Sequence, residues 1–203
     1  MAKFLNKKSC IIGKDVKFGK NVIIYPNNVI EGDTFIDDDC MILEGNNITD
    51  CNIGKNCKIH KSVLEKSEIH DQVTIGPFAR IRPNSIIKSG CRIGNFVEIK
   101  NSIIGQNCKI SHLAYVGDCE MGKDCNIGCG AIFVNYNGKT KSKCLLGNHV
   151  FIGSNCNIIA PVKIEDESFV CAGTTVTDNV ESGDFVIGRA RQENKKNRAK
   201  KDW

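Results

Sequence analysis

The sequence predicts an all-β fold, a parallel β-helix built from hexapeptide repeats. Aliphatic residues recur every five or six positions through most of the chain, a period that neither an α-helix nor an alternating β-strand produces. A glycine often follows the aliphatic residue, where the chain has to turn a corner and positive φ costs little. Each coil of such a solenoid contacts only its neighbours, so we expect a single elongated domain.

The inward positions of the repeat can be assigned from Ile12 onward. Three units make one coil and coils stand one strand spacing apart, so the repeat predicts roughly nine coils and a height of about 43 Å. The predicted inward residues are Ile12, Phe18, Ile24, Ile30, Ile36, Ile42, Ile48, Ile53, Ile59, Leu64, Ile69, Ile75, Ile81, Ile87, Ile93, Ile99, Ile104, Ile110, Val116, Met121, Ile127, Phe133, Leu146, Ile152, Ile158, Ile164, Val170 and Val176.

One polar segment, NYNGKTKSK at residues 135–143, interrupts the repeat. It contains three lysines and carries Asn-Gly as a turn signal. We therefore expect an extra loop at about residues 135–145, leaving a β-helix domain that spans residues 1–188. A loop on a rigid scaffold often carries specificity, although a tolerated insertion at a corner would look the same.

Residues 189–203 form a basic tail, which we expect to be helical. The tail holds seven basic and two acidic residues, a net charge of +5, whereas residues 1–188 carry 21 of each sign. A neutral body argues against a nucleic-acid-binding surface, for which basic residues should cluster on the fold itself. The tail could bind a phosphorylated ligand or be a solvated end.

The twelve cysteines are predicted to fill the core. Ten stand two residues before an inward aliphatic, where a small apolar side chain fits, and this spacing follows the repeat and not a disulfide or metal-ligand pattern. So many free thiols favour a reducing compartment. Without a signal-peptide core or a run of 18 apolar residues, we expect a soluble cytoplasmic protein with no membrane contact. The ten are Cys10, Cys40, Cys51, Cys57, Cys91, Cys108, Cys119, Cys125, Cys144 and Cys156.

A coil length of 17 or 18 residues places distant residues side by side. Ile81 should lie over Ile99, which puts Arg82 beside Lys100 at a rise of about 4.8 Å. Two stacked cations repel unless an acid neutralises them, and a phosphate is the anion that would suit them best.

The same count predicts a column of Asn95, His112 and Cys129, and it places Glu98 over Tyr115. The column gives His112 polar neighbours within one coil. His112 is thus a candidate general base, against the alternative of an inert surface histidine.

Six segments are more specific than the repeat: GPFARIRPNS (76–85), IGNFVEIKNS (93–102), ISHLAYVGDCEMG (110–122), NIGCGAIFVNYNGKTKSK (126–143), GSNCNIIAPV (153–162) and AGTTVT (172–177). They closely resemble the C-terminal acetyltransferase half of the bifunctional N-acetylglucosamine-1-phosphate uridylyltransferase/glucosamine-1-phosphate acetyltransferase family. The match runs from about Gly76 to Arg189, whereas residues 12–75 share only the repeat. The resemblance implies that the β-helix is left-handed.

The resemblance also implies site residues. His112 matches the family's general base, and Glu98 looks like the group that orients or polarises it. The residues implied to hold the sugar phosphate are Arg82, Lys100, Tyr115, Asn126 and Lys141. Those implied to contact acetyl-CoA are Cys129, which stands where the family usually has Ala, together with Asn135, Tyr136, Ser154, Ala172 and Arg189.

By resemblance we expect a homotrimer with sites between subunits, which transfers acetyl from acetyl-CoA to glucosamine 1-phosphate on the way to UDP-N-acetylglucosamine and the cell envelope. That chemistry needs no metal. The family's nucleotide-binding half has no counterpart in the sequence, so we expect no uridylyltransferase activity, and Trp203 is given no role.

Three alternatives stay open. The first is an acetyltransferase for another phosphorylated or nucleotide-linked amino sugar. The second is a metal hydratase, which would need three converging histidines, whereas His60, His70, His112 and His149 fall at different repeat positions. The third is a non-catalytic scaffold.

Overall fold

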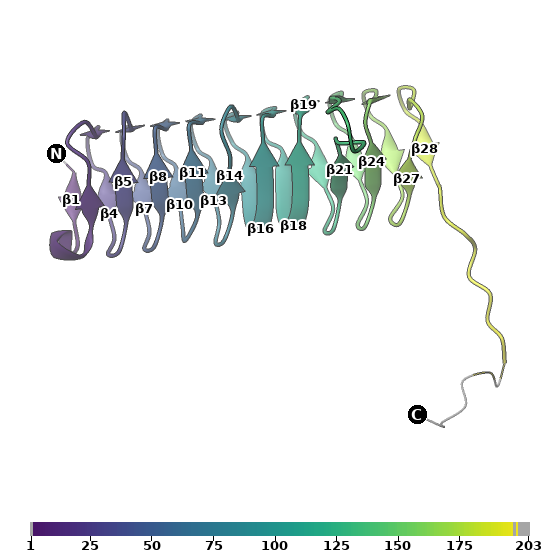
Figure 1. Ribbon diagram of the computed structural model, residues 1–203, viewed down its shortest axis with the longest axis horizontal. Coiled ribbons are helices and arrows are strands. Elements are labelled where there is room, and N and C mark those ends of the chain that lie inside the picture. The colour runs from purple at the N-terminus through teal and green to yellow at the C-terminus, as the bar shows by residue number, and fades with distance from the viewer. Residues whose placement is uncertain (1, 197, 199–203) are drawn as a thin grey trace.

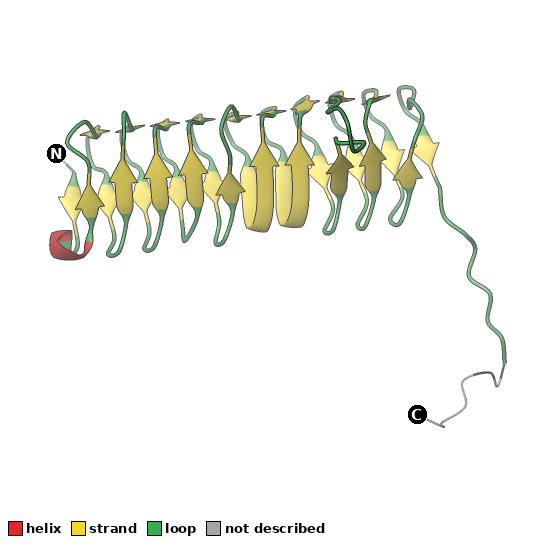
Figure 2. Ribbon diagram, viewed as in Figure 1, coloured by secondary structure: helices red, strands yellow, loops and turns green. Residues whose placement is uncertain are grey.

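Short parallel strands stack along one axis in the computed structural model, which describes residues 2–196 and 198 (Figure 1). The two ends of the solenoid are formed by the two ends of the repeat, and the tail leaves from the last strand (Figure 1). Among the described residues the only helix is the 3₁₀ turn η1 (Lys7–Ser9), near the first strand (Figure 2).

The strands form three flat faces. Face 1 consists of β1 (Lys3–Phe4), β4 (Ile23–Ile24), β7 (Met41–Ile42), β10 (Lys58–Ile59), β13 (Thr74–Ile75), the first halves of β16 (Arg92–Lys100) and β18 (Lys109–Gly117), β20 (Asn126–Ile127), β23 (Phe151–Ile152), β26 (Phe169–Val170) and β28 (Phe185–Val186). Face 2 consists of β2 (Ile11–Ile12), β5 (Val29–Glu31), β8 (Asn47–Thr49), β11 (Val63–Glu65), β14 (Arg80–Ile81), the second halves of β16 and β18, β21 (Ile132–Val134), β24 (Asn157–Ile159) and β27 (Thr175–Val176). Face 3 consists of β3 (Lys17–Phe18), β6 (Phe35–Ile36), β9 (Asn52–Ile53), β12 (Glu68–Ile69), β15 (Ile86–Ile87), β17 (Ile103–Ile104), β19 (Cys119–Met121), β22 (Cys144–Leu146) and β25 (Val162–Ile164).

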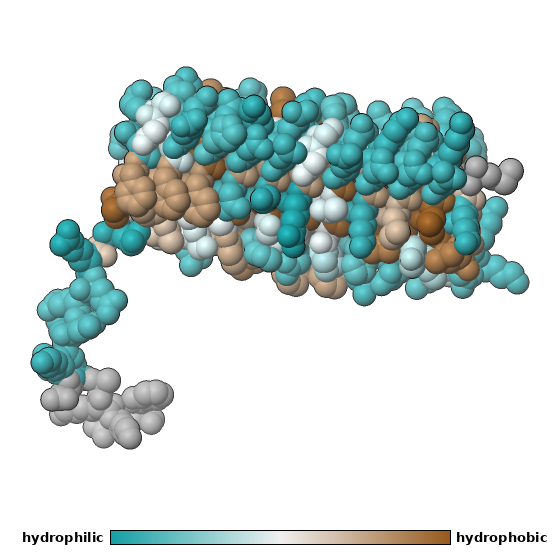
Figure 3. All heavy atoms as spheres, turned by 180° about the vertical axis from the view of Figure 1, so that it is seen from behind, coloured by the Kyte–Doolittle hydropathy of each residue, from teal (hydrophilic) through white to brown (hydrophobic). Residues whose placement is uncertain are grey.

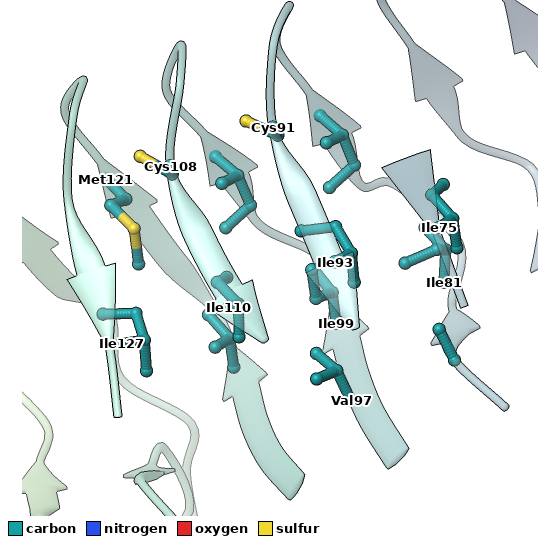
Figure 4. Close-up of a cluster of buried hydrophobic side chains, with 14 of the residues drawn as sticks. Ile75, Ile81, Cys91, Ile93, Val97, Ile99, Cys108, Ile110, Met121 and Ile127 are labelled. Carbon is teal, nitrogen blue, oxygen red and sulfur yellow. The ribbon is translucent and has the colours of Figure 1, made fainter. Parts of the chain in front are cut away.

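The core is the stack of inward aliphatic residues that the period predicts. Every predicted inward residue from Ile24 to Val176 is buried, and Figure 4 shows Ile75, Ile93, Ile110 and Ile127 following one another on consecutive coils. The predicted nine coils are too few, because β1 and β28 extend the solenoid at its two ends.

The cysteines pack as predicted. Of the ten in the repeat slot all but Cys10 are buried, and all twelve are free thiols. The slot also satisfies the thiol, since Cys91 donates to the Gly105 carbonyl at 2.9 Å and Cys108 donates to the Gly122 carbonyl at 3.1 Å. Burial raises the pKa of Cys119 well above its ordinary value, so that this thiol stays protonated.

The 135–143 loop leaves the solenoid between β21 and β22, at the corner where face 2 meets face 3. The prediction of a helical tail was wrong for the described residues, because 189–196 and 198 contain no helix (Figure 2). The tail carries no apolar stripe that could pack on the solenoid, and a short polar segment gains too little to pay helix nucleation. Residues 197 and 199–203, with Trp203, lie outside the described residues.

Face 1 ends in an exposed aromatic ladder close to where the tail leaves (Figure 3). The rings of Phe151 and Phe169 stack with centroids 4.5 Å apart, and those of Phe169 and Phe185 with centroids 5.1 Å apart. In the described part of the chain, no helix is both long and apolar enough to span a bilayer.

Candidate functional site

His112 stands at the corner between faces 1 and 2, in the middle of the long strand β18. It pairs in register with Asn95 of β16, and its Nδ1 atom lies 3.1 Å from the Asn95 Oδ1 atom. Because an amide oxygen can only accept a hydrogen bond, this contact requires a proton on Nδ1. The lone pair of the neutral ring then lies on Nε2 of an exposed side chain.

Asn95 and His112 begin a straight column along this corner, which we call the His112 column. Each further coil adds one exposed residue, because the strands stay in register from β18 through β26. Main-chain bonds hold the corner, with Asn155 N–H donating to the Cys129 carbonyl and Gly173 N–H to the Ser154 carbonyl, both at 2.8 Å. The further members of the column are Cys129, Ser154 and Ala172.

Arg189 closes the His112 column at its C-terminal end. Its Nη1 atom donates to the Ala172 carbonyl at 2.9 Å. The structure thus brings together four of the residues that resemblance assigns to acetyl-CoA, and it aligns them with His112. They are Cys129, Ser154, Ala172 and Arg189.

A second group lies at the opposite corner, between faces 2 and 3. Arg82 and Lys100 follow β14 and end β16 in register, and Lys141 comes from the 135–143 loop. These three residues, which we call the cation corner, line a cavity of about 580 Å³ together with Asn101, Asp118 and Lys143.

The argument from stacked cations needs correction, because acids neutralise both. The Arg82 guanidinium donates to Glu98 Oε1 at 2.8 Å, and the Lys100 ammonium lies 3.4 Å from Asp118 Oδ2. Glu98 also raises the pKa of Arg82. What remains is Lys141, which has no carboxylate partner among the described residues, so that the cavity keeps one uncompensated cation.

The register predictions for Glu98 are confirmed, since it pairs with Tyr115 in β18. Its carboxylate contacts Arg82, however, while the partner of the His112 ring is Asn95. The structure therefore places Glu98 with the cation corner and offers Asn95 as the residue that orients the imidazole.

The remaining predicted residues are spread around these two corners. Tyr115 lies on face 2 and accepts a hydrogen bond from the Asn135 amide at 3.4 Å, whereas Asn126 lies on face 1, in register with Lys109 and Phe151. Asn135 is buried at the base of the loop, so its side chain is not exposed to a ligand. Tyr136 is exposed and its hydroxyl donates to the Gly138 carbonyl at 2.7 Å.

One chain does not bring the two corners together. Lys100 pairs with Gly117, which is five residues along β18 from His112, a separation of roughly 16 Å along an extended strand. A single sugar phosphate cannot contact both corners of the same chain.

Sequence reasoning missed two features of the site. Beside His112, the exposed side chains of Phe78, Phe96 and Leu113 form an apolar ridge, and all three residues have left-handed backbone, with φ values of 60°, 56° and 37°. Below the cation corner, polar residues recur at a spacing of 17, and this spacing was a visible signal. They are Asn84, Asn101, Asp118 and Asn135.

The histidines do not converge. His60 contacts Glu44 at 3.1 Å, His70 contacts Glu68 at 2.7 Å and His149 lies 4.0 Å from Asp124. Among residues 2–196 and 198, no three His, Cys, Asp or Glu side chains are grouped to hold a metal ion.

Comparison with known proteins gives two family matches. Residues 63–132 match the GMPPB C-terminal domain, and residues 143–178 match the bacterial transferase hexapeptide family of six repeats.

Curated relatives match almost the whole chain. The bifunctional protein GlmU of Caldicellulosiruptor saccharolyticus is 50% identical over 187 residues, which is 92% of this chain and 40% of that protein. Bifunctional protein GlmU of Clostridium beijerinckii is 48% identical over 94% of this chain and 42% of its own length. This chain therefore spans less than half the length of these relatives. The resemblance drawn from the six segments is confirmed, since the matched part is a C-terminal segment of the bifunctional proteins.

Solved structures share the fold. A UDP-N-acetylglucosamine acyltransferase from Arabidopsis superposes with a TM-score of 0.67 at 18% identity, covering 88% of this chain and 69% of that one. LpxA, a UDP-N-acetylglucosamine acyltransferase from Bacteroides fragilis, gives a TM-score of 0.56 at 16% identity, covering 85% and 67%. These likenesses confirm the predicted left-handed parallel β-helix.

Proposed function

We propose that this chain, a homologue of the C-terminal segment of the bifunctional GlmU proteins, transfers acetyl from acetyl-CoA to the amine of glucosamine 1-phosphate. One observation carries the proposal. The His112–Asn95 pair stands in line with Cys129, Ser154 and Ala172, so the candidate base lies in the same column as the residues assigned to the acetyl donor.

His112 would act as the general base. The amine of an amino sugar is largely protonated near neutral pH and cannot attack a thioester in that form. The Nε2 lone pair, left free by the Asn95 contact, accepts one ammonium proton as the nitrogen attacks the thioester carbon. When the tetrahedral intermediate collapses, the C–S bond breaks and His112 returns a proton to the departing thiolate, so the ring ends neutral.

The oxyanion of that intermediate needs a fixed donor. In the described part of the chain the Cys129 N–H and the Ser154 hydroxyl donate to no protein acceptor, and both lie on the His112 column. Either can face the thioester oxygen without breaking a bond of the fold.

The cation corner would hold the phosphate of the acceptor. Arg82 and Lys100 keep donors beyond those that their carboxylates occupy, and Lys141 adds the uncompensated charge of the loop. Charge-assisted hydrogen bonds from such groups suit a dianionic phosphate.

We further propose that the site is completed between copies, as a homotrimer. The roughly 16 Å between His112 and the position of Lys100 along one chain means that the cation corner of a neighbour must meet the His112 column. The exposed apolar ridge beside His112 supports this, because Phe78, Phe96 and Leu113 are 54%, 57% and 58% exposed in one chain and contact with another copy would cover them.

A thiol-release assay tests the proposal. The full chain is incubated with acetyl-CoA and a panel of glucosamine, glucosamine 1-phosphate, glucosamine 6-phosphate and nucleotide-linked amino sugars. We expect release of CoA thiol at the highest kcat/KM with glucosamine 1-phosphate. A higher kcat/KM with a nucleotide-linked amino sugar would change the acceptor, and no release with any acceptor would reject acetyl transfer.

A further inference from the structure

Asp118 is a buried carboxylate that the reaction above does not use. It is 5% exposed and has left-handed backbone with φ of 51°. It stands at the corner between faces 2 and 3, between Asn101 of the preceding coil and Asn135 of the following one. A carboxylate is rarely buried in a protein unless it is fully paired, so its partners indicate what it does.

Three side chains contact this carboxylate. Asn101 Nδ2 donates to Oδ1 at 2.5 Å, Asn135 Nδ2 donates to Oδ2, and the Lys100 ammonium lies 3.4 Å from both oxygens. An ionised carboxylate can only accept, so both amides must turn their NH₂ groups toward it. Lys100, Asn101, Asp118 and Asn135 form what we call the Asp118 cluster.

Charge keeps the cluster in this state at neutral pH. Burial raises the pKa of Asp118, but hydrogen bonds from Asn101 and Asn135 and the positive charge of Lys100 outweigh burial and leave the pKa below its ordinary value.

The cluster connects two parts of the cation corner that are distant in sequence. Lys100 ends β16, whereas Asn135 is the first residue of the 135–143 loop. The two ends of that loop are joined to each other, since the Ser142 N–H donates to the Asn135 carbonyl at 2.9 Å and Tyr136 bridges Lys141. Fixing the Asn135 side chain therefore fixes the base of the loop that presents Lys141.

We propose that Asp118 is a positioning residue, which holds Lys100 and the loop bearing Lys141 in one arrangement and through them places the phosphate of the acceptor. The inference deepens the function proposed above and rests on it.

A role in charge balance alone predicts the opposite sign. Changing Asp118 to Asn removes one negative charge from the cavity, and a more positive cavity should bind a phosphate more tightly. A positioning role predicts weaker binding, because the new NH₂ group faces either an amide NH₂ or the Lys100 ammonium, and both are donors.

The experiment compares Asp118→Asn with Asp50→Asn in the full chain. Asp50 is a matched control, because it occupies the same left-handed corner with φ of 52° and accepts a hydrogen bond from the Asp33 N–H at 3.0 Å, far from the cavity at Lys100. Asn is well tolerated at such backbone angles. We expect Asp118→Asn to raise KM for glucosamine 1-phosphate by roughly tenfold, the scale of one charge-assisted hydrogen bond, with KM for acetyl-CoA changed less than about twofold. Asp50→Asn should leave both values unchanged.

A second readout does not depend on activity. The loop offers Lys139, Lys141 and Lys143 to trypsin, so release of its base should speed cleavage there several-fold in Asp118→Asn at an unchanged melting temperature. Asn135→Ala, which removes only the loop-side donor, should do the same and serves if Asp118→Asn does not fold. Parental protein that releases no thiol with glucosamine 1-phosphate would reject the proposed function, while loop cleavage would still test the cluster. An unchanged or lower KM in an active Asp118→Asn protein, or loop cleavage at the parental rate in both variants, would overturn the inference.

Discussion

The Nδ1 atom of His112 lies 3.1 Å from the Oδ1 atom of Asn95, on the neighbouring coil of the solenoid. This contact selects the tautomer in which Nε2 can accept a proton. It also makes Asn95, which no motif singled out as catalytic, the residue that orients the candidate base.

Replacing Asn95 tests this orientation. Asn95→Ala should lower kcat by roughly tenfold, because the ring is then free to rotate and to adopt the other tautomer. Asn95→Asp should keep the contact and shift the acid limb of the kcat/KM profile to higher pH, because a carboxylate stabilises the imidazolium form. Steady-state kinetics from pH 5 to 9 give both results, and a parental profile in both variants would contradict the role of Asn95.

The second prediction concerns the salt bridge between Arg82 and Glu98. Arg82→Ala should raise KM for glucosamine 1-phosphate by about tenfold or more, because it removes a phosphate donor and leaves the Glu98 carboxylate unpaired beside the phosphate. The double change of Arg82 and Glu98 to Ala should recover part of that loss.

Lys100→Ala should act in the same direction as Arg82→Ala, and the pair should lose less than the sum because both would contact one phosphate. Unchanged KM values in all of these variants would show the cation corner to be structural.

The fold could be predicted from the sequence because one coil depends only on its neighbours. The period gave the inward residues, and a coil of 17 or 18 residues gave the pairs Ile81–Ile99 and Glu98–Tyr115, which the register confirms. The choice of side-chain partner could not be read in this way. Glu98 is in register with Arg80, yet its carboxylate reaches diagonally to Arg82, and only the positions of the side chains decide that.

The repeat was also blind where the chain leaves it. The tail has no neighbouring coil and its predicted helix is absent from residues 189–196 and 198. Asp118 was missed because it lies in a corner, outside the inward positions, although Asn101 and Asn135 stand 17 residues to either side.

The third prediction concerns the tail. Ending the chain after Gly188 should raise KM for acetyl-CoA several-fold, because it removes Arg189 from the Ala172 carbonyl and most of the basic charge near the column. The effect should shrink as salt is added, and the melting temperature should hold because β28 ends at Val186. Arg189→Ala in the full chain should reproduce part of the change, whereas an unaltered KM in the shortened chain would remove the tail from the site.

The fourth prediction concerns the cysteines. In the native protein an alkylating reagent should modify Cys129 first, since it is exposed. Burial raises the pKa of Cys51 and of Cys144 to about 11, and such thiols are protonated and unreactive at neutral pH. Mass spectrometry after unfolding should then find all twelve cysteines as thiols. Stoichiometric disulfides would contradict the packing role and the reducing compartment that we propose.

The most direct test of the mechanism is the kcat of His112→Ala, measured by thiol release with saturating acetyl-CoA and glucosamine 1-phosphate. His112 is exposed and lies outside the inward positions, so the variant should keep the parental melting temperature and oligomeric state. We predict a kcat lower by about 10²–10⁴-fold, the range for loss of a positioned general base, with much smaller changes in both KM values. A variant that kept more than about a tenth of the parental kcat, less than about 1.4 kcal/mol of barrier, would contradict general-base catalysis by His112.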